Sequence, residues 1–262
     1  MTPDGHAPAV VAPTPSGSFP SERDRGFVVA RRLALARSSG PRDLASKVAR
    51  HPWDLVTAAR YVAGLPRIEA RVTATDVGEW VRHRLVSGRR VASVGLARAV
   101  LEIPDTEEAY LQGRRKQALR TNVRRAREAG STVDLAEDDG REFTEREITS
   151  HRLARLGARQ LGPAGQMVVV VSGPDGEVQA TAALAVDAEW AHLERLRHHG
   201  ARDGALMARY LLHLHVVRAL RERGVRYLHA GTTLGAKHSV GYFQYLTGYE
   251  AINIVMPVRR PS

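Results

Sequence analysis

Apolar and polar positions in the second half of the chain follow two different periods. Residues 167–172 and 178–186 are apolar runs separated by a Gly-Pro-Asp-Gly motif at 173–176, which is typical of a tight hairpin turn. In 206–220 apolar positions recur every three or four residues, which predicts an amphipathic helix closed by Gly224. The elements predicted after it are a strand at 225–230, a short helix at 238–246 and a strand at 249–257.

The strand predicted at 190–197 sorts its side chains by face, because successive residues of a strand point to opposite sides. One face is expected to hold Ala191, Leu193, Arg195 and Arg197, and the other His192, Glu194, Leu196 and His198. Ionisable groups are therefore expected on a defined side of this strand.

The first half of the chain reads as helices with a few short strands between them. The predicted helices cover 27–36, 44–49, 53–62, 75–86, 107–129 and 141–160, and the predicted strands 91–96, 100–103 and 132–135. Asp105 or Thr106 is expected to cap the helix that begins at residue 107, since both residue types accept hydrogen bonds from the first backbone N–H groups of a helix.

Composition divides the chain into three parts. Residues 1–20 contain five prolines and many small residues, so a disordered tail is expected there. Residues 21–66 are expected to form a helical extension that packs on the main domain or on a partner. Residues 67–262 are expected to form the main domain.

The composition also excludes several classes of protein. The chain has 262 residues, of which 43% are hydrophobic, so it is long enough for a sizeable core. Because it has no cysteine, disulfides, thiolate zinc sites and a cysteine nucleophile are excluded, and no metal site is expected. No apolar run approaches the ~20 residues that span a bilayer. Residues 1–20 also lack the basic start and apolar segment of a secretory signal, so a cytoplasmic location is expected.

The chain is strongly basic, and nearly all of its positive charge comes from arginine. The net charge is +11, and Lys47, Lys116 and Lys237 are the lysines. Such a surface attracts nucleic acid, anionic lipid or a pyrophosphate, although a bias toward arginine also arises from codon composition. Residues expected to contact phosphate groups, those of a nucleic acid among them, are Lys116, Arg120, Arg124, Arg125 and Lys237. For those in the helix predicted at 107–129, the alternative is that they form a solvated helix face without a binding role.

Two motifs resemble a known family. The first runs from Tyr110-Leu111-x-x-Arg114 through Arg120-x-Asn122-x-Arg124-Arg125-Ala126-x-x-Ala129-Gly130, and the second is Ser239-x-x-x-Phe243-Gln244-x-x-x-Gly248. Together with the order of elements, they resemble the GNAT acyltransferase fold over roughly residues 100–257, and within it the Fem-like branch. That branch joins amino acids to amines using aminoacyl-tRNA. The resemblance implies a GNAT-like α/β (α+β) fold, a mixed central sheet flanked by helices with an N-terminal helical extension.

The resemblance places the donor at the end of the strand 190–197 and the loop after it. Residues matched to the donor-binding loop are Arg197, His199, Gly200, Arg202 and Gly204. Acetyl-CoA enzymes have Arg/Gln-x-x-Gly-x-Gly/Ala here, whereas this chain has Arg202 in place of the last small residue. A side chain at that position hinders close approach of pyrophosphate to the backbone, so aminoacyl-tRNA is expected as co-substrate, with no tightly bound cofactor. Acetyl-CoA is the alternative donor.

The candidate catalytic residues are Glu194, Tyr242 and Tyr245. Acetyl-CoA members often have a tyrosine where this chain has Gln244, and Fem-like members often have a lysine there. Glu194 is the candidate base for the proton that leaves the amine, with an ion pair to an arginine as its alternative role. Three functions remain open: an aminoacyltransferase acting on a small molecule or cell-wall precursor, an acyl-CoA-dependent N-acetyltransferase, and a non-catalytic module that binds nucleic acid.

Overall fold

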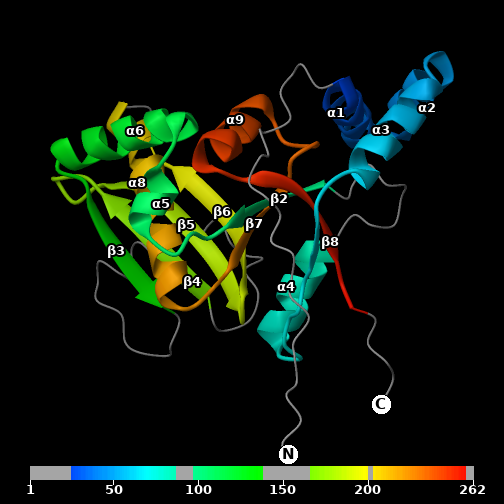
Figure 1. The fold of residues 1–262 in the computed structure, drawn as a ribbon. Coiled ribbons are helices and arrows are strands. Elements are labelled where there is room, and N and C mark those ends of the chain that lie inside the picture. The colour runs from blue at the N-terminus through cyan, green and yellow to red at the C-terminus, as the bar shows by residue number, and fades with distance from the viewer. Residues whose placement is uncertain (1–24, 87–96, 138–165, 200–202, 258–262) are drawn as a thin grey trace, which may run out of the picture.

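The computed structural model describes residues 25–86, 97–137, 166–199 and 203–257 of the chain. Within these ranges the strands form one eight-stranded mixed sheet in the order β1-β8-β2-β7-β6-β5-β4-β3, flanked by helices (Figure 1). This α/β arrangement is consistent with a GNAT-like fold and confirms the fold class expected from the sequence. The tail predicted at 1–20, the strand predicted at 91–96 and the helix predicted at 141–160 lie outside the described residues.

The bounds of the elements agree with most of the predicted ranges. The strands are β1 (Arg67–Glu69), β2 (Ala97–Glu102), β3 (Thr132–Glu137), β4 (Gln166–Ser172), β5 (Val178–Asp187), β6 (Trp190–His198), β7 (Tyr227–Thr232) and β8 (Glu250–Val255). The helices are α1 (Arg25–Ser39), α2 (Pro41–Arg50), α3 (Trp53–Ala63), α4 (Asp76–Val86), α5 (Glu107–Leu111), α6 (Gln117–Glu128), α8 (Asp203–Glu222) and α9 (His238–Thr247), with a 3-10 turn η2 (Arg114–Lys116). The three-residue strand β1, which pairs in parallel with β8, was not among the predicted strands.

The sheet has two apolar faces, and different helices cover them. Alternate residues of β5 divide between the faces: Leu184 belongs to the core cluster that includes α8 and α6, whereas Ala185 belongs to the cluster that includes α4. The long helix α8 contacts β4, β5 and β6. Burial of its apolar side on the sheet explains why a segment with its three-to-four-residue period becomes a helix here.

The parallel strands β6 and β7 are paired over only three residues. Trp190, Ala191 and His192 pair with Tyr227, Leu228 and His229, and no further pair joins the two strands. Beyond these residues the strands diverge, so their facing edges are not joined by sheet hydrogen bonds. This separation opens the sheet at its centre.

A register shift in β6 overturns the predicted alternation of its side chains. Ala183 of β5 lies opposite Arg195, but Leu184 lies opposite Leu193, so Glu194 is an extra residue in the β6 strand. A bulge of this type reverses which face the following residues use. Leu196 consequently packs against the same core cluster as Leu193, although the uninterrupted pattern placed them on opposite faces.

The helix predicted at 107–129 is wrong as a single element. It is interrupted after α5, because Gly113 adopts a positive φ of 91° that a right-handed helix does not allow. The turn η2 and the helix α6 follow. The cap of α5 is Thr106, whose side-chain oxygen accepts a hydrogen bond from the N–H of Ala109 at 3.1 Å.

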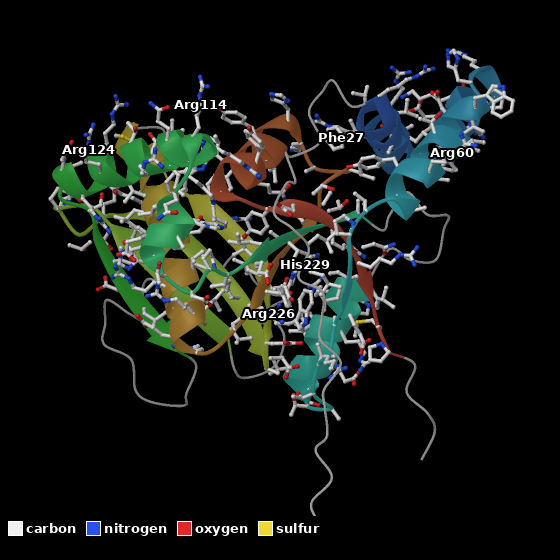
Figure 2. The ribbon with its side chains drawn as sticks, viewed as in Figure 1. Phe27, Arg60, Arg114, Arg124, Arg226 and His229 are labelled. Atoms are coloured by element: carbon white, nitrogen blue, oxygen red, sulfur yellow. The ribbon has the colours of Figure 1, made fainter. Side chains whose placement is uncertain are left out.

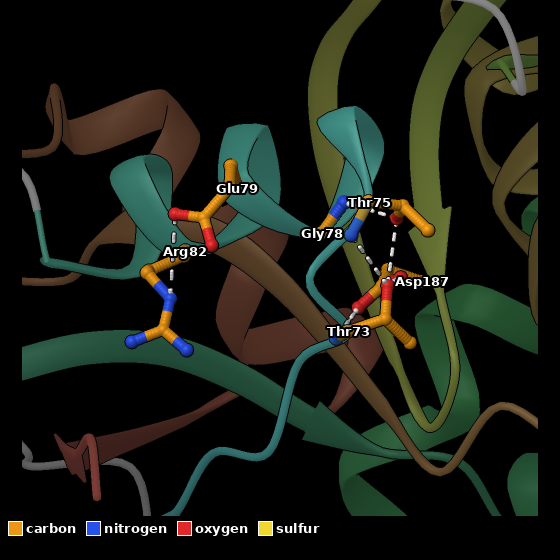
Figure 3. A network of polar contacts seen from close by, with 6 residues as sticks. All are labelled: Thr73, Thr75, Gly78, Glu79, Arg82 and Asp187. Atoms are coloured by element: carbon orange, nitrogen blue, oxygen red, sulfur yellow. Dashed lines mark hydrogen bonds and ion pairs between the residues drawn. The ribbon is translucent and has the colours of Figure 1, made fainter. Parts of the chain in front are cut away.

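The start of α4 is fixed to the turn between β5 and β6 by a polar network (Figure 3). The buried carboxylate of Asp187 accepts hydrogen bonds from the backbone N–H of Thr73, at 2.7 Å, and from its hydroxyl. The Thr75 hydroxyl in turn accepts a hydrogen bond from the N–H of Gly78 in the first turn of α4. This network holds the start of α4 against the end of β5, next to the strand β6 that contains Glu194.

The helices α1, α2 and α3 match the three helical patterns predicted at 27–36, 44–49 and 53–62, and they project from one end of the sheet (Figure 1). Leu33 and Val62 pack in one apolar cluster with Ala97 and Leu234, which belong to the main sheet region. This contact joins the helices to the rest of the molecule. Among the described residues, no helix is both long and apolar enough to cross a membrane.

Candidate functional site

A cavity of about 310 Å³ lies where β6 and β7 separate. Its walls come from β6, β7, α8 and α9, and they include Glu194, Arg195, Arg209, Ala230, Phe243 and Gln244. Strand β6 supplies Glu194 and Arg195, strand β7 supplies Ala230, and the helices α8 and α9 supply the others. The cavity therefore combines a carboxylate, two guanidinium groups and an amide with an apolar wall.

The carboxylate of Glu194 is held by residues of α4 and β6. Its Oε1 accepts hydrogen bonds from Trp80 Nε1 at 2.7 Å and from Arg84 Nε at 3.0 Å, and it lies 3.5 Å from His192 Nε2. The side chain of Glu194 is only 9% exposed. The alternative role of Glu194, an ion pair with an arginine, is therefore present in the structure, with Arg84 as the partner. A carboxylate offers about four acceptor positions, so capacity remains for a ligand in the cavity.

Two buried histidines stack beside Glu194. The rings of His192 and His229 have centroids 4.7 Å apart, and Figure 2 places His229 at the centre of the molecule. Burial, reinforced by the charge of Arg84, lowers the pKa of His192 to about 3. Burial and the neighbouring His192 likewise lower the pKa of His229 well below its usual value. Both rings are therefore neutral at pH 7.

A second buried network lies behind the cavity wall and joins α5, α8 and the segment from the end of α9 to Tyr249. The hydroxyl of Tyr110 donates to the carbonyl of Thr247 at 3.1 Å and lies 2.9 Å from His213 Nδ1. Because that hydroxyl has a single proton, His213 Nδ1–H must be the donor of the second bond. His213 Nε2 then accepts from the hydroxyl of Tyr249, a cavity residue, at 3.0 Å. Burial, with a smaller effect of Lys116, lowers the pKa of His213 to about 3, which agrees with a neutral ring.

The two predicted catalytic tyrosines do not line this cavity. Tyr242 is 54% exposed on the outer side of α9. Tyr245 instead lines a groove of about 630 Å³ between α6 and α9, where the Arg115 guanidinium lies 4.4 Å above its ring. Arg115 also donates to the carbonyls of Tyr245 and Tyr249, and this fixes the groove wall.

The residues predicted to bind the donor lie at the end of β6 and the start of α8. Arg197 is exposed, and Gly204 is half-buried in the first turn of α8. His199 is oriented by a 3.0 Å hydrogen bond between its Nε2 and the hydroxyl of Thr181. Burial and the neighbouring Arg197 lower the pKa of His199. Gly200 and Arg202 lie outside the described residues.

Lys116 is more enclosed than its predicted role as a phosphate contact suggests. Its ammonium donates to the carbonyl of Thr247 at 2.6 Å and lies 4.1 Å above the ring of Tyr110. Burial and the charge of Arg115 lower the pKa of Lys116 to about 7. The fold thus engages this amine in joining η2 to the end of α9.

The other predicted phosphate contacts are exposed and differ in how far they are engaged. Arg120 donates to the carbonyls of Leu111 and Gly113, and it thereby closes the break between α5 and α6. Arg124 is 3.5 Å from Glu128 in an exposed ion pair, and Figure 2 shows it with Arg114 on the outer side of the α6 region. Arg125 and Lys237 are also exposed.

Several cavity residues were not among the candidate site residues from the sequence, and three of them have polar side chains with buried atoms that are unpaired among the described residues. These three are Arg195 in β6, Arg209 in α8 and Gln244 in α9. The sequence signal for Gln244 was its place in the second motif, where acetyl-CoA members often have a tyrosine and Fem-like members a lysine; its side chain is 2% exposed in the structure. Among the described residues, no three histidine, aspartate or glutamate side chains are grouped in a way that would hold a metal ion.

A comparison with protein-family models and with curated proteins gives no match. Among solved structures, the chain is similar to the C-terminal domain of a putative lysylphosphatidylglycerol synthetase from Agrobacterium fabrum, at 19% identity and a TM-score of 0.41, over 60% of this chain and 58% of that one. It is also similar to L-PGS from Bacillus licheniformis, at 12% identity and a TM-score of 0.42, over 59% of this chain and 57% of that one. The same holds for FemX, at 11% identity and a TM-score of 0.42, over 59% of this chain and 58% of that one. The chain thus spans less than two thirds of each of these structures, and the likeness concerns the fold.

Proposed function

We propose that this chain is an aminoacyltransferase that moves an aminoacyl group from aminoacyl-tRNA to an amine of a small molecule or a cell-wall precursor in the cytoplasm. The observation that best supports this proposal is the cavity between β6 and β7, which has both Glu194 and two guanidinium groups in its wall. Acyl transfer to an amine requires a group that takes a proton from the amine and a donor for the developing oxyanion. The motifs that resemble the Fem-like branch support the same class of donor.

In the proposed reaction the acceptor ammonium first loses a proton to Glu194, directly or through water. The free amine attacks the ester carbonyl carbon of aminoacyl-tRNA, and a C–N bond forms as the carbonyl becomes an oxyanion. Collapse of this intermediate breaks the C–O bond to the terminal ribose, and the second amine proton passes to the departing ribose hydroxyl. Trp80 and Arg84 position the carboxylate, because both donate to its Oε1. Tyr242 and Tyr245 lie outside this cavity and are given no step in the proposed reaction.

The tRNA is proposed to approach the outer side of α6 and the end of β6. Arg124 and Arg125 are exposed cations of α6, and Lys237 is an exposed cation at the start of α9. The residues matched to the donor loop are Arg197, His199, Gly200, Arg202 and Gly204. Arg120 contributes by bonding the segment between α5 and α6, and Lys116 contributes by joining η2 to the end of α9. Contacts of exposed arginines with phosphate release counterions, so affinity is expected to fall steeply as salt rises.

The test is transfer of radiolabelled amino acids from charged total tRNA to a panel of amines that contains hydroxylamine, an amino sugar and a lysine peptide. We expect product only with charged tRNA, and we expect tRNA binding that weakens between about 50 mM and about 200 mM salt. Glu194→Gln should slow transfer by about 100-fold or more, the usual contribution of a general base. Glu108→Gln, the same change at an exposed position of α5, is the matched control.

Two results would reject this proposal. Thermal stabilisation by coenzyme A or acetyl-CoA, with no response to tRNA, would assign the cavity to an acyl-CoA donor. Salt-dependent tRNA binding without transfer to any amine in the panel would leave a non-catalytic module that binds nucleic acid.

A further inference from the structure

Three buried polar atoms in the wall of the β6–β7 cavity lack a hydrogen-bond partner among the described residues. They are Gln244 Oε1, Arg195 Nη1 and Arg209 Nε. Buried polar groups in folded proteins are nearly always paired, because an unpaired one loses its hydration without compensation. Three such atoms around one cavity therefore indicate a ligand that supplies the missing partners.

The chemistry of the Gln244 end is fixed by a neighbouring backbone group. The Gln244 amide lies 2.9 Å from the carbonyl oxygen of Ala230, the first residue of β7 beyond those that pair with β6. Since a carbonyl only accepts, the atom facing it must be the amide nitrogen, and the unpaired atom is the oxygen. This end of the cavity consequently needs an N–H donor from the ligand.

The arginine end has the opposite requirement. The Arg209 guanidinium is oriented by the rings of Tyr210 and Phe243, at 4.9 Å and 5.4 Å, and its Nη2 donates to the hydroxyl of Tyr210. With these contacts made, Arg209 Nε has no acceptor among the described residues, and Arg195 Nη1 has none there either. Both atoms are donors, so the ligand must present an oxygen acceptor to them.

We infer that the cavity recognises an α-aminoacyl group, with its ammonium on Gln244 and its carbonyl oxygen on Arg195 and Arg209. This inference rests on the proposed function and identifies Gln244 as the residue that distinguishes an aminoacyl group from a plain acyl group. An acyl group without the amine leaves Gln244 Oε1 unpaired, and sites that hydrogen-bond a substrate N–H discriminate strongly against ligands that lack it. The volume of about 310 Å³ suits a small group of this kind.

The inference is tested with free amides, which require neither tRNA nor an acceptor. Glycinamide, alaninamide and leucinamide are compared with acetamide, propionamide and 4-methylpentanamide, which have the same carbon skeletons without the amine. Dissociation constants are measured by saturation-transfer NMR titration on the full chain. We expect the best amino amide to bind about tenfold or more tightly than its partner without the amine.

Substitutions separate the two ends of the cavity. Gln244→Met, which keeps the length of the side chain, should reduce the preference for the amine at least about threefold, since it removes the acceptor for the ammonium. Arg209→Gln should weaken both members of a pair by the same factor and leave their ratio unchanged. Gln112→Met, at the exposed end of α5, is the control for the glutamine change. The ratio of two affinities does not respond to a general loss of stability.

The outcomes are distinct from those that test the proposed function. Three results would overturn the inference: equal affinities within each pair of amides, an unchanged ratio of these affinities in Gln244→Met, or no saturation transfer to any of the six amides. If the amine preference is present and depends on Gln244 but charged tRNA gives no transfer, the aminoacyl subsite stands and the assigned donor is wrong. Transfer from tRNA without a Gln244-dependent preference rejects the subsite and leaves the reaction in place.

Discussion

His213 offers a sharp test of the buried network behind the cavity, because its two ring nitrogens bond different tyrosines. In His213→Leu the Tyr249 hydroxyl loses the acceptor that it uses in the structure, while the Tyr110 hydroxyl still donates to the carbonyl of Thr247. Tyr249 is fully buried, so its unpaired hydroxyl should cost about 1–3 kcal/mol. We therefore expect His213→Leu to lower the free energy of unfolding by about that amount.

The diagnostic result is a change of sign for Tyr249→Phe. In the wild-type background this change leaves His213 Nε2 without its donor and should destabilise the protein by about 1 kcal/mol. In the His213→Leu background it removes the unpaired hydroxyl and should restore about 1–2 kcal/mol, because deleting both members of a buried pair costs less than deleting one.

The assay is urea unfolding of the four proteins, followed by tryptophan fluorescence and analysed as a double-mutant cycle. Tyr242→Phe, at an exposed hydroxyl of α9, is the control and should change stability by less than about 0.5 kcal/mol in either background. If Tyr249→Phe destabilises both backgrounds equally, His213 is not the acceptor for that hydroxyl and the deduced tautomer is wrong.

Further predictions concern acid stability and the end of α9. Three buried histidines have a lowered pKa in the folded state: His192, His213 and His229. The unfolded chain therefore binds protons that the folded chain does not, so stability should fall as pH drops below about 6.5, by up to about 1.4 kcal/mol per pH unit for each histidine; urea midpoints that stay constant from about pH 7 to about pH 4 would contradict this. Gly248→Ala should destabilise by more than about 1 kcal/mol in thermal unfolding, because Gly248 has a φ of 96° and an added Cβ would overlap the Lys116 ammonium. A melting temperature equal to that of wild type would show that the end of α9 rearranges freely.

Much of the fold was predictable from local sequence. The hairpin at Gly173 to Gly176, the period of α8 and the cap at Thr106 all act within a few residues, so their signals are present in the chain itself. The break between α5 and α6 was also local, since Gly113 marked it, but the surrounding helical pattern concealed it. The bulge at Glu194 was not predictable, because it is defined by the pairing of β6 with β5.

The sequence by itself determined the class of fold, the basic character and Glu194 as a candidate. Only the tertiary structure decided what surrounds that carboxylate, because Trp80 lies 114 residues away from it and meets it through the packing of α4 on the sheet. The same is true of Gln244, Arg195 and Arg209, which come from three elements and share one cavity. Local periodicity specifies which residues are apolar enough to be buried. Which polar groups are buried with them, and with what partner, depends on contacts between distant segments, and the site is built from those groups.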